Sequence, residues 1–391
     1  MVRVPSLFSQ LLRFFPRSEF SRLVAEHEAE RAAKGFSCWT QFVAMLFCQL
    51  AQADSLRAIC LGLSLALGRL RHLGIDVPPN KSTLSYANAH RPAALFEDLF
   101  WHAAERFRQS GSLGPRRHKF RFKNKLLSLD STTVSLCLSL FPWASFRRRK
   151  GGVKAHVLLD HDDYMPAWVL ITEAKVADVT AARLLRLNKG SIVAMDRGYV
   201  DFALFRHWTD AGVFFVTRLK EGILYEVVES RPVPANRGIL ADQVIRLTSV
   251  KAAEACPHLL RRVVVWDEEK GEQIELLTNH LDFGATTIAA IYKERWQIEL
   301  FFKALKQNLH VKTFVGTSEN AVKVQIWTAL IAMLLLKFLH LKAAFGWGLS
   351  NLSSLLRMNL FTYRDLWAWL NIPFKKAAML AGPEQLVLEG V

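Results

Sequence analysis

The chain has 391 residues and a formal net charge of +16, because 51 Lys and Arg residues outnumber 35 Asp and Glu residues. This length allows two or three domains with a sizeable core, and the charge indicates a polyanionic partner, although ribosomal and membrane-surface proteins share the same bias. The five cysteines are scattered with no CxxC pair, which excludes a zinc site or a disulfide framework and favours buried thiols in a reducing compartment.

Two features argue against secretion and membrane insertion. The N-terminus carries several arginines but no apolar segment that ends at a small-residue cleavage site. The longest apolar run, 326–336, is about half the length that a membrane-spanning helix needs, and Lys323 and Lys337 flank it. We therefore expect a buried helix in this run, no membrane partner, and a cytoplasmic protein.

About a hundred residues at the start of the chain are predicted to be helical. Apolar side chains recur at helical spacing from Phe36 to Leu50, and Ser55 can cap the next helix. Asn80 can cap a further helix that opens with Lys81. Two such helices joined by a turn could recognise DNA, but a helical bundle produces the same pattern through packing alone.

Two basic segments follow. The first contains six cations within ten residues, with two phenylalanines between them: Arg116, Arg117, Lys119, Arg121, Lys123 and Lys125. The second is Arg147–Lys150. Such segments attract phosphates, and that attraction weakens as the salt concentration rises. A solvated basic linker is the open alternative for both.

A buried strand is predicted at 126–134, where an apolar stretch ends in Asp130 and continues as Ser-Thr-Thr. An aspartate at a strand end is usually a turn former or a cap, so Asp130 alone does not identify a catalytic site. Two more strands are predicted at 153–160 and 168–172. The aspartates at 160, 162 and 163 lie at the tip of this hairpin, where turn chemistry explains them better than metal ligation.

A second strand that ends in an acid covers 191–195 and leads to Asp196, Arg197 and Gly198. A helix is predicted before it, from Ala181 to Leu187. Asp196 lies 66 residues after Asp130, which leaves room for two strands and a helix. Both acids are therefore expected on neighbouring strands of one sheet.

The next 103 residues, up to Glu299, are more than one strand and one helix require. Four strand-like segments lie there, at 224–229, 243–248, 260–266 and 273–278, separated by proline and glycine. We interpret them as a β-rich insertion that interrupts an α/β fold.

The segment Tyr292–Lys306 is predicted to form one helix. At about 100° per residue, its Tyr292, Arg295, Glu299 and Lys306 share one narrow face, and Lys303 lies beside them. Apolar residues occupy the neighbouring face, as in a helix that packs on a sheet. One carboxylate among cations and a phenol is suited to holding a divalent cation beside a polyanion. The alternative is a solvated face with ion pairs.

These motifs resemble those of a known family. Tyr292, Arg295, Glu299 and Lys306 match the YREK signature of IS4-type transposases with no departure in spacing. The segments that begin at Asp130 and Asp196 look like the first and second aspartate motifs of the same family. The resemblance implies a DDE transposase with an RNase H-like fold, in which Asp130, Asp196 and Glu299 bind two Mg²⁺ ions, or Mn²⁺ in their place.

The resemblance also implies roles for other residues. Tyr292, Arg295 and Lys306 would hold phosphates beside the cleavage site, and Lys303, Trp296 and Arg197 are further candidates for contact with DNA. Relatives can stack a flipped base on a tryptophan of the insertion, although packing in the core is our preferred interpretation of Trp266.

The same family is expected to act on double-stranded DNA, namely terminal inverted repeats and target DNA, as a homodimer in the bacterial nucleoid. The expected reaction is cut-and-paste transposition through hairpin ends. The predicted segments are a helical DNA-end-binding domain (1–115), an RNase H-like core in two parts (116–222 and 281–345), the β-rich insertion (223–280) and a helical tail (346–391).

Two alternatives stay open. The first is an RNase H-like DNA nuclease that uses the same acids without strand transfer. The second is an inactive, transposase-derived DNA-binding protein, against which the presence of all three acids counts. A glycosidase with paired carboxylates is less consistent with the +16 charge.

Overall fold

The computed structural model describes residues 4–31, 33, 35–65, 70–111, 113, 119–136, 140–147, 150–235, 237–311 and 314–374. Arg116, Arg117, Arg148 and Arg149 of the basic segments lie outside these residues, as does the tail from 375 onward.

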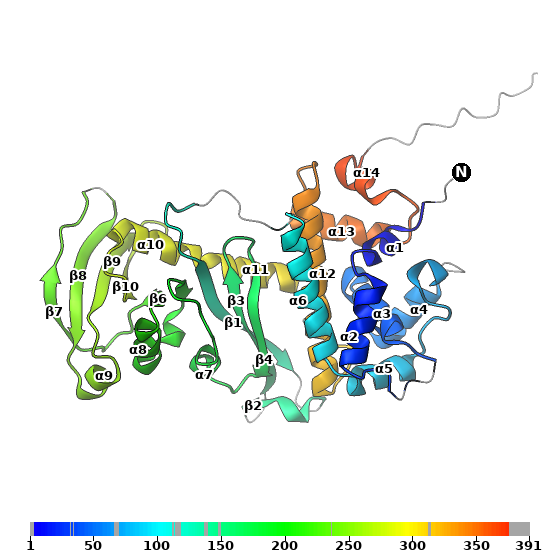
Figure 1. Ribbon diagram of the computed structural model, residues 1–391, viewed down its shortest axis with the longest axis horizontal. Coiled ribbons are helices and arrows are strands. Elements are labelled where there is room, and N and C mark those ends of the chain that lie inside the picture. The colour runs from blue at the N-terminus through cyan, green and yellow to red at the C-terminus, as the bar shows by residue number, and fades with distance from the viewer. Residues whose placement is uncertain are drawn as a thin grey trace, which may run out of the picture.

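Helices make up one half of the molecule (Figure 1). The N-terminal helices are α1 Leu7–Leu12, α2 Arg17–Glu26, α3 Cys38–Ala51, α4 Leu56–Ser64, the 3₁₀ helix η1 Leu70–Leu73, α5 Lys81–His90 and α6 Ala94–Gln109. The C-terminal helices are α12 Glu319–Lys342, α13 Leu349–Asn359 and α14 Leu366–Asn371. Ser55 and Asn80 cap α4 and α5, as the sequence predicts, because their side chains accept from the N–H groups of Ala58 and Ser82.

Helix α12 is apolar on all sides because it lies inside the protein. Within the described residues it is the one helix long and apolar enough to cross a membrane by length and composition, and 83% of its most apolar window is buried. Figure 1 shows α6 and α12 side by side between the sheet and the other N-terminal helices. The buried helix predicted for 326–336 is confirmed.

The two ends of the described chain share one hydrophobic core. Leu7 and Phe8 donate main-chain hydrogen bonds to the carbonyls of Thr362 and Leu360. The largest core cluster joins side chains of the N-terminal helices to those of α12 and α13, and it continues onto the face of the sheet that carries Val157. The N-terminal helices are thus packed against C-terminal elements and against the sheet.

Within the described residues, ten strands form one mixed sheet. They are β1 Leu126–Leu136, β2 Ser145–Arg147, β3 Lys150–Asp160, β4 Met165–Glu173, β5 Ile192–Met195, β6 Phe214–Arg218, β7 Tyr225–Ser230, β8 Ile239–Leu247, β9 Leu260–Asp267 and β10 Glu272–Thr278. Their order is β2-β3-β1-β5-β6-β10-β9-β8-β7, and β4 pairs with β3. β1, β3 and β4 are antiparallel neighbours, whereas β1, β5 and β6 run parallel.

Helices cover both faces of this sheet (Figure 1). One face carries α7 Asp178–Ala182, α8 Phe202–Asp210 and α9 Val250–Ala255, and the other carries α10 Ala285–Glu294 and α11 Trp296–Asn308. Side chains alternate along β1. Leu127 and Leu129 pack with α8, whereas Leu126 packs with α10. Asp130 is four residues after Leu126 on this alternating strand, so its side chain lies on the same face, the one that α10 and α11 cover.

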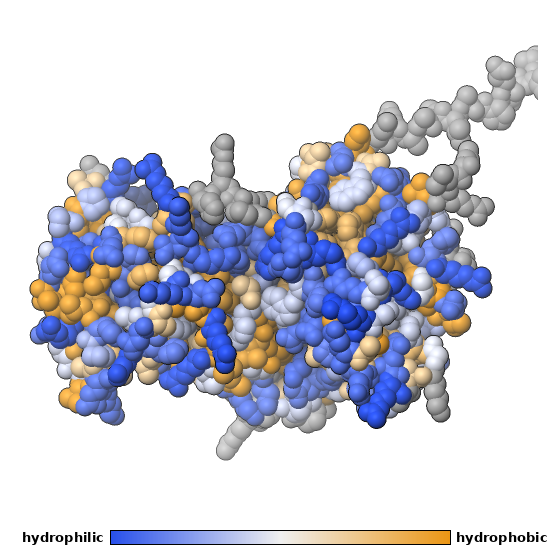
Figure 2. All heavy atoms as spheres, viewed as in Figure 1, coloured by the Kyte–Doolittle hydropathy of each residue, from blue (hydrophilic) through white to orange (hydrophobic). Residues whose placement is uncertain are grey.

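The strands of the predicted insertion extend the main sheet. β10 pairs with β6 on one side and with β9 on the other, so β7 to β10 continue the sheet to its far edge. A buried ion pair between Arg261 and Asp242, with both Nε and Nη2 about 2.7 Å from the carboxylate, ties β9 to β8. Figure 2 shows hydrophobic side chains gathered at the β7 end, where Val227 and Val228 are exposed.

The helix predicted from Ala181 to Leu187 is wrong in its bounds. Helix α7 begins at Asp178 and ends at Ala182. The following residues turn toward β5, and this turn includes Gly190 at φ +85°, a conformation that favours glycine. The acids at the hairpin tip behave as predicted, because Asp160 and Asp163 accept main-chain hydrogen bonds within the turn.

Candidate active site

Asp130 and Asp196 occupy equivalent places on two adjacent parallel strands. Leu129 of β1 pairs with Met195 of β5, and each aspartate is the residue that follows. Both aspartates have the parity of the side chains that face α10, such as Leu126 and Ala194. The strand register therefore brings two acids 66 residues apart in sequence to one face and one level of the sheet.

The segment Tyr292–Lys306 is two helices, and the predicted single helix is wrong in this respect. Helix α10 ends at Glu294 and α11 begins at Trp296, with Arg295 between them at φ −52° and ψ −30°. At this junction the Arg295 N–H donates to the Tyr292 carbonyl and the Ile298 N–H donates to the Arg295 carbonyl. These bonds span three residues instead of four, so the helix is tightened locally while its direction continues. The apolar stripe is buried as predicted, for example at Ile291 and Ile298.

Arg295 lies between two of the predicted acids. Its Nη2 is 2.6 Å from Glu299 Oε1, and its Nη1 is 3.7 Å from Asp130 Oδ2. The guanidinium also stands 5.6 Å from the centre of the Tyr292 ring. Only 14% of the Arg295 side chain is exposed, and its buried Nε has no hydrogen-bond partner in the described part of the chain. The cation of the signature is thus turned inward, toward the acids.

The charges of Asp196 and Glu299 act on Asp130. The pKa of Asp130 is raised to about 6, chiefly by burial, while the Ser131 N–H and Arg295 oppose the shift and the charges of Asp196 and Glu299 add to it. Burial alone would lower the pKa of Arg295, but its anionic neighbours outweigh that effect and raise it. Asp130 is therefore a carboxylate whose negative charge is incompletely balanced by Arg295.

Tyr292 belongs to the same electrostatic group. Burial raises the pKa of its phenol, Arg295 and Arg218 oppose the shift, and the charge of Asp196 adds to it. Tyr292 therefore lies near the second aspartate, while Glu299 and Arg295 lie near the first.

The chemistry of these acids suits a divalent cation, although the side chains do not converge as they stand. Three carboxylates on one face supply the hard oxygen ligands that Mg²⁺ prefers. Within the described residues, no three His, Cys, Asp or Glu side chains lie close enough together to bind one metal ion. The Glu299 carboxylate accepts a hydrogen bond from Arg295. Asp130 and Asp196 offer two carboxylates on one face of the sheet, and the donor chemistry of all three acids suits such an ion.

The remaining predicted DNA contacts surround this group. Lys306 Nζ is 3.5 Å from the Thr133 carbonyl of β1, which places the end of the signature over the strand that carries Asp130. Lys303 and Arg197 are exposed, and Trp296, next to Arg295, is 54% exposed. These three side chains are accessible to a large ligand.

Arg218 is a cation of this site that the sequence analysis did not select. It ends β6, and the pairing of Ala194 with Val216 places it level with Asp196 and on the same face. Its Nη2 is 3.1 Å from Glu272 of β10. The available signal was an apolar run, 213–216, followed by Thr217 and Arg218. This run indicates a site residue only when β6 is known to lie beside β5.

Trp266 is not packed in the core, which corrects our preferred interpretation. It lies near the end of β9 and is 42% exposed. The neighbouring Val265 packs against the α10 core, so the alternation of the strand turns Trp266 to the opposite face. β9 runs in the same direction as β5. The exposed ring of Trp266 therefore lies at the carboxyl ends of these strands, where Asp196 also lies.

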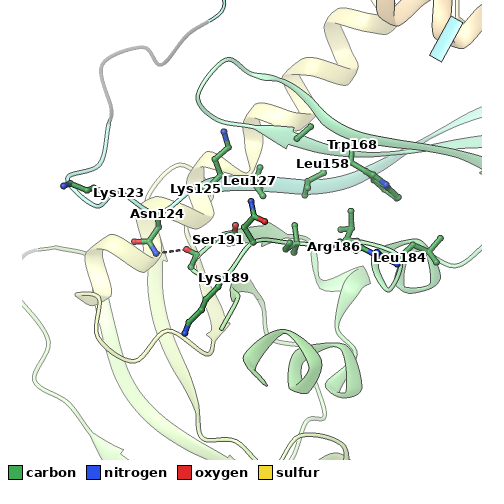
Figure 3. Close-up of a pocket in the computed structure, with 15 residues that line it drawn as sticks. Lys123, Asn124, Lys125, Leu127, Leu158, Trp168, Leu184, Arg186, Lys189 and Ser191 are labelled. Carbon is green, nitrogen blue, oxygen red and sulfur yellow. Dashed lines mark hydrogen bonds between the residues drawn. The ribbon is translucent and has the colours of Figure 1, made fainter. Parts of the chain in front are cut away.

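A cavity of about 850 Å³ lies elsewhere, at the amino-terminal ends of β1 and β5. Figure 3 shows Lys123, Arg186 and Lys189 around it, with Leu127 and Trp168 in its wall. Neither aspartate lines it. The two aspartates are half-buried on the other side of the sheet, facing α10 and α11, and this cavity is not part of the candidate site.

Comparison with known proteins gives the class of the chain. Residues 121–335 match the family described as "Transposase DDE domain", and residues 4–76 match a domain of unknown function, DUF4372. The first match covers more than half of the chain, which therefore belongs to the transposase DDE domain family. Members of this class are polynucleotidyl transferases, so the chain is an enzyme that acts on DNA, and membership of the family implies the use of a divalent metal.

Individual relatives narrow the class to insertion-sequence transposases. The chain is 36% identical over 275 residues to a Sinorhizobium fredii protein named as transposase y4zB, covering 69% of this chain and 74% of the relative. It is 32% identical to a protein named as a transposase for insertion sequence element IS5377 from Geobacillus stearothermophilus, covering 57% and 59%. It is 27% identical to Transposase InsG for insertion sequence element IS4 from Escherichia coli, covering 39% and 36%.

Among solved structures, the piggyBac transposase synaptic complex with hairpin DNA aligns with a TM-score of 0.41 and 10% identity, covering 96% of this chain and 83% of that chain. The predicted resemblance to IS4-type transposases is confirmed by the family match and the relatives. The chain is a DDE transposase of the insertion-sequence type.

Proposed function

We propose that this transposase cuts and joins DNA at the ends of an IS4-type element by Mg²⁺-dependent phosphoryl transfer, with Asp130, Asp196 and Glu299 as its metal ligands. The observation that carries the proposal is the strand register, which places Asp130 and Asp196 side by side under Arg295 and Glu299. The order β4-β3-β1-β5-β6, with three antiparallel strands followed by two parallel ones, supports an RNase H-like core for residues 116–222 and 281–345.

The three acids and Arg295 would have separate roles. Asp130, Asp196 and Glu299 would hold two Mg²⁺ ions, or Mn²⁺ as a substitute. Bound cations supply the Lewis acidity that activates a water or a 3′-hydroxyl and neutralises the leaving oxygen. Arg295, released from Glu299, would pair with a phosphate oxygen, because a guanidinium binds phosphate as readily as carboxylate.

Other cations would hold the DNA. Tyr292 and Lys306 would fix the phosphates beside the cleaved bond, and the exposed Lys303 and Arg197 would contact the backbone farther away. Trp296 is exposed beside Arg295, which makes it a platform for a base near the DNA end.

The proposal also gives roles to whole segments of the chain and to the assembly of two subunits. Residues 1–115 would bind the terminal inverted repeats, and residues 223–280 form the β-rich insertion. Two subunits would hold two element ends in the bacterial cytoplasm, at the nucleoid, and cleavage would proceed through hairpin ends before joining to the target.

An assay with a labelled element end and a supercoiled target plasmid tests the proposal. We expect Mg²⁺-dependent cleavage and a joined product from the wild type, and retained end binding with neither product from Asp196→Ala. Cleavage without any joined product would favour a nuclease. End binding with no cleavage in Mg²⁺ or Mn²⁺ would favour an inactive DNA-binding descendant.

A further inference from the structure

Asp178 lies across the sheet from Arg295 and Glu299. It is the first residue of α7, which covers the face opposite α10 and α11 (Figure 1). This short helix packs against η3, a 3₁₀ turn at Arg197–Tyr199 that directly follows Asp196. Asp178 is thus close in space to the chain segments that carry both aspartates.

One oxygen of Asp178 receives two hydrogen bonds. Ser131 Oγ donates to Asp178 Oδ1 at 2.7 Å, and Lys154 Nζ donates to the same atom at 3.1 Å. Lys154 also donates to the Val176 carbonyl at 2.9 Å, which fixes the loop before α7. The nearby His156 is buried, and burial lowers its pKa to about 4, so Lys154 supplies the positive charge that balances Asp178.

Ser131 connects this network to Asp130. Consecutive residues of a strand point to opposite faces, so Ser131 directs its hydroxyl toward Asp178 while Asp130 faces α11. The Ser131 N–H donates to Asp130 Oδ1 at 2.7 Å. Among the residues that the structure describes, Arg295 is the one cationic contact of this carboxylate, at 3.7 Å. The orientation of Asp130 therefore depends on the placement of Ser131.

Tyr199 belongs to the turn that follows Asp196 and packs against α7. Its N–H donates to the Asp196 carbonyl at 3.1 Å, which closes the turn behind the second aspartate. The Tyr199 side chain is 2% exposed, and burial raises the pKa of its phenol, with the charges of Asp178 and Asp130 adding to the shift. Asp196 itself makes no side-chain hydrogen bond or ion pair within the described residues, so its position depends on this turn.

We propose that Asp178 is a positioning residue for the metal site, because its carboxylate holds Ser131 beside Asp130 and its helix packs against the turn that follows Asp196. The inference rests on the proposed function, since it concerns the two aspartates assigned there as metal ligands. Residues behind metal ligands orient them, and their loss typically lowers metal affinity about 10–100-fold.

Binding of Mn²⁺ to the full-length protein, measured by the loss of the electron paramagnetic resonance signal of free Mn²⁺, tests this role without relying on catalysis. We expect Asp178→Ala and Ser131→Ala to raise the Kd for Mn²⁺ by about tenfold or more. Ser131→Thr keeps a hydroxyl at this position and should have the same Kd for Mn²⁺ as the wild type. If Asp178→Ala does not fold, the difference in Kd for Mn²⁺ between Ser131→Ala and Ser131→Thr tests the role of this network.

Asp201→Ala is the matched control. Asp201 also makes two polar contacts, a 2.8 Å bond from the Leu204 N–H that caps α8 and a 2.8 Å ion pair with Arg183, but it touches neither Ser131 nor Tyr199. It should lower the Tm and leave the Kd for Mn²⁺ within about twofold of wild type.

An unchanged Kd in both Ser131→Ala and Asp178→Ala, with wild-type binding intact, would overturn the positioning role and leave the proposed metal site standing. Absence of Mn²⁺ binding by the wild type, or full binding by Asp130→Asn, would overturn the proposed function itself and the inference with it.

Discussion

Replacing Asp130 by asparagine should stabilise the metal-free protein, because the native fold holds this carboxylate at a cost. The pKa of Asp130 is raised from 3.8 to about 6, with burial as the main cause. A raised pKa means that the folded state binds the proton more tightly than the unfolded state does. The cost is therefore absent below pH 3.8, grows as the pH rises toward 6, and is fully present at pH 7 and above.

The size of the effect follows from the same values. The interval between 3.8 and about 6 corresponds to about 3 kcal/mol at about 1.4 kcal/mol for each pH unit. The substitution also removes the attraction between Asp130 and Arg295, which returns part of this gain. We expect a net stabilisation of about 1–3 kcal/mol at pH 7.5.

Thermal and urea unfolding in the presence of a chelator, followed by circular dichroism from pH 5 to pH 7.5, measures this difference. Asp130→Asn should have the higher midpoint at pH 7.5, and its advantage should shrink as the pH falls. Asp201→Asn, which keeps a side chain able to cap α8, serves as the control and should show no advantage of this kind. A variant less stable than wild type at pH 7.5, or an advantage independent of pH, would refute the assignment of Asp130 as a buried, poorly balanced carboxylate.

Four further substitutions address other parts of the site. Arg295→Met leaves two carboxylates without their shared cation and should destabilise the metal-free protein by about 3 kcal/mol. Mg²⁺ should then raise the Tm of this variant more than it raises the Tm of wild type. An equal rise in both proteins would contradict the role of Arg295 as the cation shared by the acids. Glu299→Gln should reduce Mg²⁺-dependent cleavage at least about 100-fold with end binding retained, and near-normal cleavage would exclude Glu299 as a ligand. Arg197→Ala and Lys303→Ala should each make the slope of log affinity against log salt less steep by about 0.9, measured by filter binding or anisotropy. An unchanged slope would show that the residue does not contact phosphate.

Much of the fold was predictable because its signals are local. The apolar runs that end in Asp130 and Asp196 form strands, and the caps at Ser55 and Asn80 begin helices as expected. The four strands of the insertion were predicted close to their observed bounds. Strand pairing is a long-range property, so the continuation of the main sheet from β6 into β10 could not be predicted from the composition of either strand.

The helix ends show where local signals fail. The apolar spacing that suggested a helix up to Leu187 also describes a turn that buries Leu185, and the need to reach β5 decides between them. The break at Arg295 has no proline or glycine to mark it. Arg295 contacts Asp130 and Glu299 at this break, and the contact with Asp130 on a distant strand is not a local signal.

The roles of the three acids stay predictions, but their placement shows what the sequence could indicate. The spacing of the signature selected Arg295 and Glu299, which lie beside each other, and the sheet register places Asp130 next to Asp196. Arg218 and Asp178 carry no motif, and they become significant only through neighbours distant in sequence. The exposure of Trp266 depends on which face of β9 the helices cover, which its own sequence does not encode.

In the proposed site, three acids hold the catalytic metal over the DNA backbone. Anomalous diffraction from Mn²⁺ in crystals of the full chain bound to an element end would locate the metal and its ligands. We expect Mn²⁺ peaks in contact with Asp130, Asp196 and a Glu299 side chain that has separated from Arg295. Peaks bound by other residues, or a Glu299 that stays on Arg295 while Mn²⁺ and DNA are bound, would contradict the claim.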